Sequence, residues 1–224
     1  MNDLVDSNSH KNPKWDLDVQ IEKSPYFWNG DPIFYPPIER ANNTGFTVAE
    51  MFSGCGGTSK GFEMAGFNVI FGTDIHKPSI ETFRMNNKRA AAILSDVKKI
   101  NPDDVNKSID HKQIDVLIAG VPCQGFSLNN RKRNHNDERN YLFLEFMRFV
   151  EALKPKIVLI ENVSGLKSTA NGSFVNAITD AIEKAGDYTV YCKLLKAADY
   201  GVPQLRERIF FIGVPKHATF VWPK

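Results

Sequence analysis

A cysteine in the segment Gly120-Val121-Pro122-Cys123-Gln124 has the setting of a nucleophile. It follows a predicted buried strand, and Pro122 restricts the backbone of the turn that presents it. An ordinary thiol is only a few per cent thiolate at neutral pH, so a nucleophilic role requires cationic neighbours. Arg131–Arg133, Arg206 and Arg208 are the candidates. The alternative is a buried, unreactive cysteine, which is the usual state of a lone cysteine.

The acid Glu161 ends a second apolar strand, Ile157–Ile160, and Asn162 follows it. Burial at such a strand end raises the pKa of a carboxyl group, which would make it a proton donor near neutral pH. The competing interpretation is an ion pair with an arginine that closes the strand end. Arg206 and Arg208 alternate at strand spacing, so both are expected on one face, whereas Arg131–Arg133 alone is typical of a solvated loop.

A glycine-rich turn, Ser53-Gly54-Cys55-Gly56-Gly57, follows the predicted strand Thr47–Phe52 and precedes a helix. The dinucleotide-binding pattern GxGxxG would need glycine where this chain has Ser59, and the phosphate-binding loop would need lysine where it has Phe62. Neither common phosphate site is therefore predicted. A purely structural glycine turn is the alternative to a ligand site.

Two acids after the next strands complete the pattern of a nucleoside site. Asp74 stands 20 residues after Gly54, at a strand end where an acid typically accepts hydrogen bonds from ribose hydroxyls. Asp96 follows the third strand and is expected to face an adenine. A nucleoside without a phosphate to hold indicates S-adenosylmethionine.

Strands and helices must position these residues. Apolar and amphipathic segments alternate after residue 46 and predict where those elements lie. The alternation predicts the α/β class, with a doubly wound, mostly parallel sheet and helices on both faces. Ligands bind such sheets at the carboxyl ends of the strands. Strands are predicted at Thr47–Phe52, Val69–Thr73, Ala91–Leu94, Asp115–Ala119 and Ile157–Ile160, and helices at Ser59–Ala65, Pro78–Met85, Tyr141–Leu153 and Phe174–Ala185. Two last strands, Thr189–Leu195 and Arg208–Val214, are expected to pair antiparallel at one edge.

The composition fits one sizeable domain, with 224 residues of which 42% are hydrophobic and 24% charged. Residues 1–45 carry four basic and seven acidic residues, and the remainder carries 24 basic and 19 acidic residues, a balance compatible with a polyanionic partner. No apolar run approaches the ~18 residues of a membrane span, and no signal peptide is evident. The isolated Cys55, Cys123 and Cys192 predict free thiols of a cytoplasmic protein and no metal site.

Residues 1–45 are predicted to form an irregular N-terminal extension, because prolines such as Pro32, Pro36 and Pro37 interrupt the hydrophobic periodicity that a helix or strand would show. The extension is nevertheless too aromatic for a plain linker. It is either a strap docked on the domain or an arm that binds a partner. The aromatic residues are Trp15, Tyr26, Phe27, Trp28, Phe34 and Tyr35.

Four motifs in this order resemble the C5-cytosine DNA methyltransferase family, over about three-quarters of the chain. They are Phe52-Ser53-Gly54-Cys55-Gly56-Gly57, Pro122-Cys123-Gln124, Glu161-Asn162-Val163 and Gln204-Leu205-Arg206-Glu207-Arg208. The resemblance implies the S-adenosylmethionine-dependent methyltransferase fold. It also implies methyl transfer to C5 of a cytosine flipped out of double-stranded DNA, with S-adenosylhomocysteine as product.

The resemblance also implies a role for each matching position. Cys123 would add to C6 of cytosine, Glu161 would hold N3, and Asn162 would brace the cysteine loop. Phe52 would stack on adenine, and Asp74 would hold the ribose, although many relatives have Glu there. The full catalytic set is Pro122, Cys123, Gln124, Glu161, Asn162, Arg206 and Arg208; the cofactor set is Phe52, Ser53, Gly54, Cys55, Gly56, Gly57, Asp74, Ile75, Asp96, Val97, Gly120 and Pro122. Ser127 and Arg131–Arg133 are expected to grip DNA phosphates.

The family pattern continues beyond its last strand into a target-recognition region and a closing helix, whereas this sequence stops at Lys224. We expect residues 46–215 to form the catalytic domain and residues 216–224 to start a truncated or split continuation. The chain is then a fragment, one half of a split enzyme whose partner chain supplies recognition, or a degenerate copy. Alone, it is expected to show weak or no sequence-specific methylation.

Other functions are also compatible with these motifs. They are an RNA (tRNA) cytosine-5 methyltransferase and a non-catalytic DNA-binding subunit, while the broken glycine pattern disfavours a nicotinamide oxidoreductase. The expected location is the bacterial cytosol or nucleoid, without a membrane partner.

Overall fold

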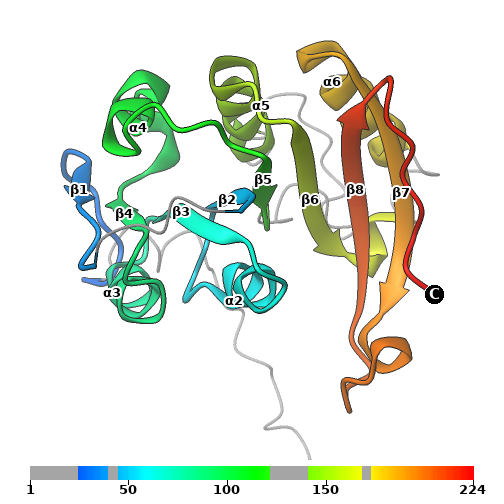
Figure 1. The fold of residues 1–224 in the computed structure, drawn as a ribbon, viewed down its shortest axis with the longest axis horizontal. Helices are drawn as coiled ribbons and strands as arrows, with labels where there is room; N and C mark the ends of the chain where they lie inside the picture. Colours follow the sequence, from blue (N-terminus) through cyan, green and yellow to red (C-terminus); the bar gives the residue numbers. More distant parts are fainter. Residues whose placement is uncertain (1–24, 40–44, 122–140, 168–172) are drawn as a thin grey trace, which may run out of the picture.

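The computed structural model describes residues 25–39, 45–121, 141–167 and 173–224. Across these ranges, one eight-stranded sheet runs through the molecule in the order β1-β4-β3-β2-β5-β6-β8-β7 (Figure 1). The strands are β1 (Ile33–Tyr35), β2 (Thr47–Met51), β3 (Asn68–Asp74), β4 (Ala91–Leu94), β5 (Val116–Ala119), β6 (Ile157–Val163), β7 (Tyr188–Lys196) and β8 (Glu207–Pro215).

The five strands from β2 to β6 run parallel, and their order reverses at β2, which lies between β3 and β5. The predicted doubly wound, mostly parallel sheet is therefore confirmed. β8 pairs antiparallel with β7, as expected, and also antiparallel with β6. The reversed strand thus lies one position inside the edge, and β7 forms the edge itself.

Helices cover both faces of the sheet (Figure 1). One face carries α2 (Gly57–Met64) and α3 (Lys77–Asn86), and the other carries α4 (Pro102–Ser108), α5 (Tyr141–Leu153) and α6 (Ser173–Ala185). Alternate residues of the central strands belong to two separate hydrophobic cores, one on each face of the sheet. Val116 and Ile118 of β5 face the core under α3, whereas Leu117 and Ala119 pack with the core under α5. This two-sided burial explains why β5 is apolar throughout.

The described part of the N-terminal extension adds a strand that the sequence did not predict. β1 pairs antiparallel with β4, with Phe34 opposite Ile93, and it occupies the sheet edge farthest from β7. The guanidinium of Arg84 on α3 lies 4.1 Å from the ring centre of Tyr35. The division of the chain at residue 45 stays a prediction. Within the described ranges, no helix combines the length and apolar character needed to cross a membrane.

Candidate active site

The glycine-rich turn joins the carboxyl end of β2 to α2. Phe52 adopts φ 56°, a left-handed conformation that costs a bulky residue about 1–3 kcal/mol and is typical of functional turns. The Ser53 amide donates to the Thr73 carbonyl at 2.9 Å, which fastens the turn to β3. Gly56 has φ 84°, and a Cβ there would lie 2.7 Å from Asn87 Nδ2. Glycine at position 56 is therefore required both by backbone conformation and by space.

Asp74 lies at the end of β3 and holds two loops through its carboxylate. Its Oδ2 accepts a hydrogen bond from the Gly54 amide at 2.8 Å, and its Oδ1 accepts one from the His76 amide at 2.8 Å. A carboxylate oxygen can accept a second hydrogen bond, so the same group can also take a hydroxyl donor. The structure therefore brings the glycine turn and the proposed ribose acid into direct contact.

Sequence reasoning missed a second acid in this region, Glu50 in the middle of β2. Only 3% of it is exposed, and its Oε2 accepts from the Ser59 amide at 3.0 Å and from Ser59 Oγ at 2.5 Å. Burial raises the pKa of Glu50, while hydrogen bonds from Ser59 oppose that rise. The carboxyl group acts as an N-cap for α2, supplied from a neighbouring strand. The available signal was a lone acid within the otherwise apolar Thr47–Met51.

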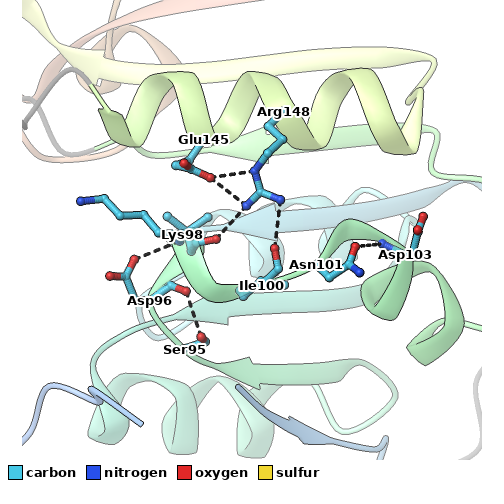
Figure 2. A network of polar contacts seen from close by, with 9 residues as sticks. Ser95, Asp96, Lys98, Ile100, Asn101, Asp103, Glu145 and Arg148 are labelled. Atoms are coloured by element: carbon cyan, nitrogen blue, oxygen red, sulfur yellow. Dashed lines mark hydrogen bonds and ion pairs between the residues drawn. The ribbon is translucent and has the colours of Figure 1, made fainter. Parts of the chain in front are cut away.

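Asp96 begins the single turn η1 (Val97–Lys99) after β4, and its Oδ1 accepts from the Lys98 amide at 3.0 Å. Figure 2 shows that Arg148 on α5 reaches down to this turn. Its Nη1 and Nη2 donate to the carbonyls of Ile100 and Val97, both at 3.0 Å. Glu145, one turn earlier on α5, pairs with Arg148 at 2.7 Å.

This Arg148 clamp fixes the backbone of the turn that carries Asp96 (Figure 2). A charged donor that satisfies two carbonyl groups stabilises a turn more than neutral donors do. Sequence reasoning did not single out either side chain. The signal was an acid and a base three residues apart on a mostly apolar helix whose one other charged residue is Glu151.

At the carboxyl end of β6, Glu161 forms an ion pair with both predicted arginines. Its Oε1 lies 2.9 Å from Arg208 Nε and 3.4 Å from Arg206 Nη2, and 27% of its side chain is exposed. The ion-pair interpretation of Glu161 thus describes this structure. Both arginines reach the same carboxylate oxygen, as their alternate spacing predicts. Arg208 is opposite Val163 on β6, so the antiparallel register delivers it to this site.

Contacts also join the ends of β5 and β6. Asn162 is 4% exposed, and its Nδ2 donates to the Val121 carbonyl at 3.4 Å, while its Oδ1 accepts from the Val163 amide at 2.8 Å. A Cβ at Gly120 would lie 3.6 Å from Glu161 Oε2. Val121 is two residues before Cys123 in the sequence. The predicted Pro122, Cys123, Gln124, Ser127 and Arg131–Arg133 lie outside the described residues.

The remaining predicted cofactor residues follow the carboxyl ends of the same strands, and of these Val97 is buried in the hydrophobic core. Cys55 is exposed, and its carbonyl accepts from Asn86 Nδ2 at 3.1 Å. Ile75 directly follows Asp74, and Val97 directly follows Asp96. Gly57 begins α2, and no atom lies within 4 Å of a Cβ built there or at Gly54. The backbone of the turn is therefore open to a ligand in the described structure.

The chemistry of this edge fits a nucleoside better than a phosphate. Within the described part of the chain, Ser53 Oγ and Thr73 Oγ1 are buried without a hydrogen-bond partner, which leaves two hydroxyls for a polar ligand. The N-terminus of α2 would attract a phosphate, but Glu50 already occupies its Ser59 amide. No lysine or arginine lies between Phe52 and Ser59. A cofactor with positive rather than negative charge suits such acidic surroundings.

Two surface hollows of about 420 Å³ each lie elsewhere in the described structure. One is lined by Asn68 and Lys88, and the other by Pro36 and Asp110, at or beyond the amino ends of the strands. Neither contains a predicted site residue. Because ligands bind α/β sheets at the opposite, carboxyl edge, we do not assign the site to these hollows.

Comparison with known proteins agrees with these motifs. The family model of the C-5 cytosine-specific DNA methylase matches residues 46–222. The Type II methyltransferase M1.HphI of Haemophilus parahaemolyticus is 39% identical over 80% of this chain and 48% of its own length. M.AquIA of Picosynechococcus is 36% identical over 79% of this chain and 75% of its own length.

A crystal structure gives the same result at the level of the fold. A candidate DNA modification methyltransferase from an E. coli prophage superposes with a TM-score of 0.66 and 35% identity, over 77% of this chain and 47% of that one. The chain spans 40–48% of the length of several curated relatives that it matches.

Proposed function

The chain belongs to the C-5 cytosine-specific DNA methylase family, and we propose that it transfers a methyl group from S-adenosylmethionine to C5 of cytosine in double-stranded DNA. The relatives named as Type II methyltransferases support a role in restriction–modification. The cytoplasmic location is part of the same proposal. Because the chain spans only about half of those relatives, target recognition is assigned to further polypeptide, either of the same chain or of a second chain.

S-adenosylmethionine, when bound, supplies an electrophilic methyl group. We assign its nucleoside end to the edge formed by the glycine turn, Asp74 and Asp96. There, Asp74 accepts from the ribose hydroxyls while it holds the Gly54 amide, and the open backbone at Gly54 and Gly57 leaves room for the ligand. Ser53 Oγ offers a buried hydroxyl without another partner in the described residues. These residues bind and orient the cofactor.

Cytosine C5 is a weak nucleophile, so the chain must activate it. The Cys123 thiolate adds to C6, and the π electrons shift through C5 and C4 to N3, where Glu161 in its protonated form, released from the arginine pair, donates a proton or a strong hydrogen bond. C5 would then take the methyl group that the bound cofactor supplies, with S-adenosylhomocysteine as the leaving group. A base removes the C5 proton, the thiolate leaves C6 as the C5–C6 double bond re-forms, and the proton on N3 returns to Glu161. The cytosine must first flip out of the duplex to reach these groups.

The observation that carries this proposal is the junction of β5, β6 and β8. Glu161 lies there between two arginines, and Asn162 binds the Val121 carbonyl two residues before Cys123. These contacts put an acid and two arginines beside the segment that leads to Cys123, where the proposed addition to C6 needs an acid for N3. A non-catalytic DNA-binding subunit has no need of it.

Covalent trapping tests the proposal directly. DNA that contains 5-fluorocytosine should form a denaturation-resistant adduct with the chain in the presence of S-adenosylmethionine, because fluorine at C5 blocks proton removal and hence thiolate release. Cys123→Ala should abolish the adduct. Cys192→Ala on β7, at an exposed cysteine, is the matched control and should leave it unchanged.

Three outcomes would contradict the proposal. The first is an adduct that survives Cys123→Ala, which would place the nucleophile elsewhere. The second is transfer of labelled methyl groups to tRNA but not to DNA, which would support the RNA methyltransferase alternative. The third is the absence of both adduct and transfer, which would show that this chain alone is not a catalyst.

A further inference from the structure

The first described segment of the chain makes backbone contacts with the loop that follows Asp74. We define residues 25–35 as the N-terminal strap. The Trp28 amide donates to the Ile75 carbonyl at 2.9 Å, and the Lys77 amide donates to the Tyr26 carbonyl at 2.8 Å. Between these bonds, Phe27 and His76 form an antiparallel bridge. The strap therefore pairs with the backbone that directly follows β3. This pairing lies at the carboxyl end of the strand, where ligands bind such sheets.

Aromatic rings reinforce this pairing around His76. The Phe27 ring centre lies 5.3 Å from that of His76, and the Tyr26 ring centre lies 6.1 Å from it in an edge-to-face arrangement. On its other side, His76 Nδ1 lies 2.8 Å from Ser79 Oγ on α3. The His76 ring is thus held between the strap and α3, and the position of the His76 backbone depends on both.

His76 connects the strap to the proposed ribose acid. Its amide donates to Asp74 Oδ1, while the Gly54 amide donates to Asp74 Oδ2, each at 2.8 Å. A continuous series of contacts therefore runs from Phe27 through His76 and Asp74 to the glycine turn. A shift of His76 would change the acceptor geometry of Asp74.

The strap also reaches the second acid-bearing turn. Lys99 Nζ, at the end of η1, donates to the carbonyls of Asn29 and Gly30. The strap then continues into β1, where Ile33 is opposite Leu94, two residues before Asp96. One short segment thus contacts the loops after both β3 and β4, which carry the two proposed nucleoside acids.

From these contacts we infer that the N-terminal strap is a positioning element for S-adenosylmethionine, which acts on Asp74 through His76 and on Asp96 through Lys99. The inference rests on the proposed function. It gives the aromatic residues of the extension a role in cofactor affinity, in place of a plain covering of the sheet edge or a partner-binding arm. Trp28 stabilises the bend of the strap, since its Nε1 donates to the Asp31 carbonyl at 2.7 Å.

The test uses residues 1–224 and the variant Phe27→Ala, which removes the ring contact with His76. We expect the Kd for S-adenosylmethionine, measured by isothermal titration calorimetry, to rise about five- to tenfold, the lower range of typical coupling between sites. Hydrogen exchange of the Gly54 and His76 amides should become faster without ligand. Lys99→Met, a change at an exposed side chain, is the second variant and should raise the Kd about threefold.

Phe220→Ala is the matched control, because the Phe220 ring packs on Tyr191 of β7 at 5.5 Å, at the opposite edge of the sheet. It should leave the Kd and both exchange rates unchanged. The inference is overturned if Phe27→Ala and Lys99→Met bind as the wild type does, or if Phe220→Ala weakens binding equally. A wild type that does not bind the cofactor would instead overturn the proposed function. In that case, unchanged exchange rates in Phe27→Ala would separately overturn the positioning role.

Discussion

The two halves of the site are held by different kinds of interaction. At the proposed cofactor half, the carboxyl groups of Asp74 and Glu50 accept hydrogen bonds from backbone amides, those of the neighbouring loops for Asp74 and that of Ser59 in α2 for Glu50. At the cytosine half, Glu161 contacts the side chains of Arg206 and Arg208. The proposed cofactor half is thus held through backbone amides, and the proposed cytosine half is held through contacts between long side chains.

This difference matches what each half is proposed to bind. A carboxylate that holds backbone amides fixes its loop with little loss of side-chain entropy, so a small cofactor meets a preformed surface. The Arg206 side chain is 48% exposed and that of Arg208 25%, so solvent screens the Arg206–Glu161 pair more strongly than the Arg208–Glu161 pair. We therefore expect mutations in the two halves to affect different steps.

The largest effect is expected for Glu161→Gln. The variant keeps the shape but cannot supply the proton at N3, so methyl transfer in a single-turnover assay should fall about 100-fold or more. The Kd for S-adenosylmethionine should stay within about twofold, since no cofactor contact is lost. Glu207→Gln, at the neighbouring exposed acid, is the control. Equal losses of cofactor binding and transfer would abolish the distinction between the halves.

Asp74→Asn should show the reverse pattern. Its amide nitrogen would face the Gly54 or His76 amide, and one donor would lose its acceptor. Because a hydrogen bond to a charged group is worth about 1.5–3 kcal/mol, the Kd for S-adenosylmethionine should rise roughly ten- to 100-fold. Transfer at saturating cofactor should change little. Asp104→Asn on α4, which removes an exposed pair with Lys107, should have no effect on calorimetric binding.

A smaller effect is expected for Arg148→Met, which removes the clamp on η1 but keeps the aliphatic stem. Two carbonyls would lose their charged donor, so urea denaturation should show a loss of roughly 1–2 kcal/mol in the free energy of unfolding. The Kd for the cofactor should rise about threefold, because only the Asp96 turn is loosened. Glu145→Gln should produce part of both changes. Wild-type affinity in Arg148→Met would separate the clamp from the site.

The smallest effect concerns pH and Glu50. Burial raises its pKa above the ordinary value of 4.5, so the folded state binds more protons than the unfolded state above that pH. The contribution of this group to stability is fully present below pH 4.5 and declines as pH rises through the raised pKa. Glu50→Gln should remove that decline, so its stability relative to wild type should improve between pH 4.5 and pH 7. Glu63→Gln on the exposed face of α2 should show no such trend in urea denaturation.

Sequence patterns predicted the sheet well because each central strand is a short apolar run and each long helix has an amphipathic period. They also predicted that Arg206 and Arg208 share a face, since strand spacing decides this locally. The ends of helices and strands were predicted less accurately than their positions in the chain. α2 begins at Gly57 and not at Ser59, because the cap that ends the turn comes from Glu50 on another strand.

Features that depend on distant partners were not predictable from local patterns. β1 has three residues, and only its pairing with β4, about 60 positions along the chain, makes it a strand. The same holds for Arg148, whose acceptors Val97 and Ile100 are 51 and 48 residues away in sequence. The roles of the catalytic residues came from the ordered motifs and the resemblance that they support, and those roles stay predictions.

The reversed direction of β8 determines where chain length can vary. Arg208 enters the sheet at the start of that strand and is held in register on both sides, by Val163 on β6 and by Leu195 on β7. The turn between β7 and β8, around Gly201 at φ 82°, lies outside this ladder. Residues inserted there would lengthen an exposed loop beside the proposed cytosine site without displacing the arginine. The hairpin thus offers a place where new DNA contacts can be added while the chemical step is preserved.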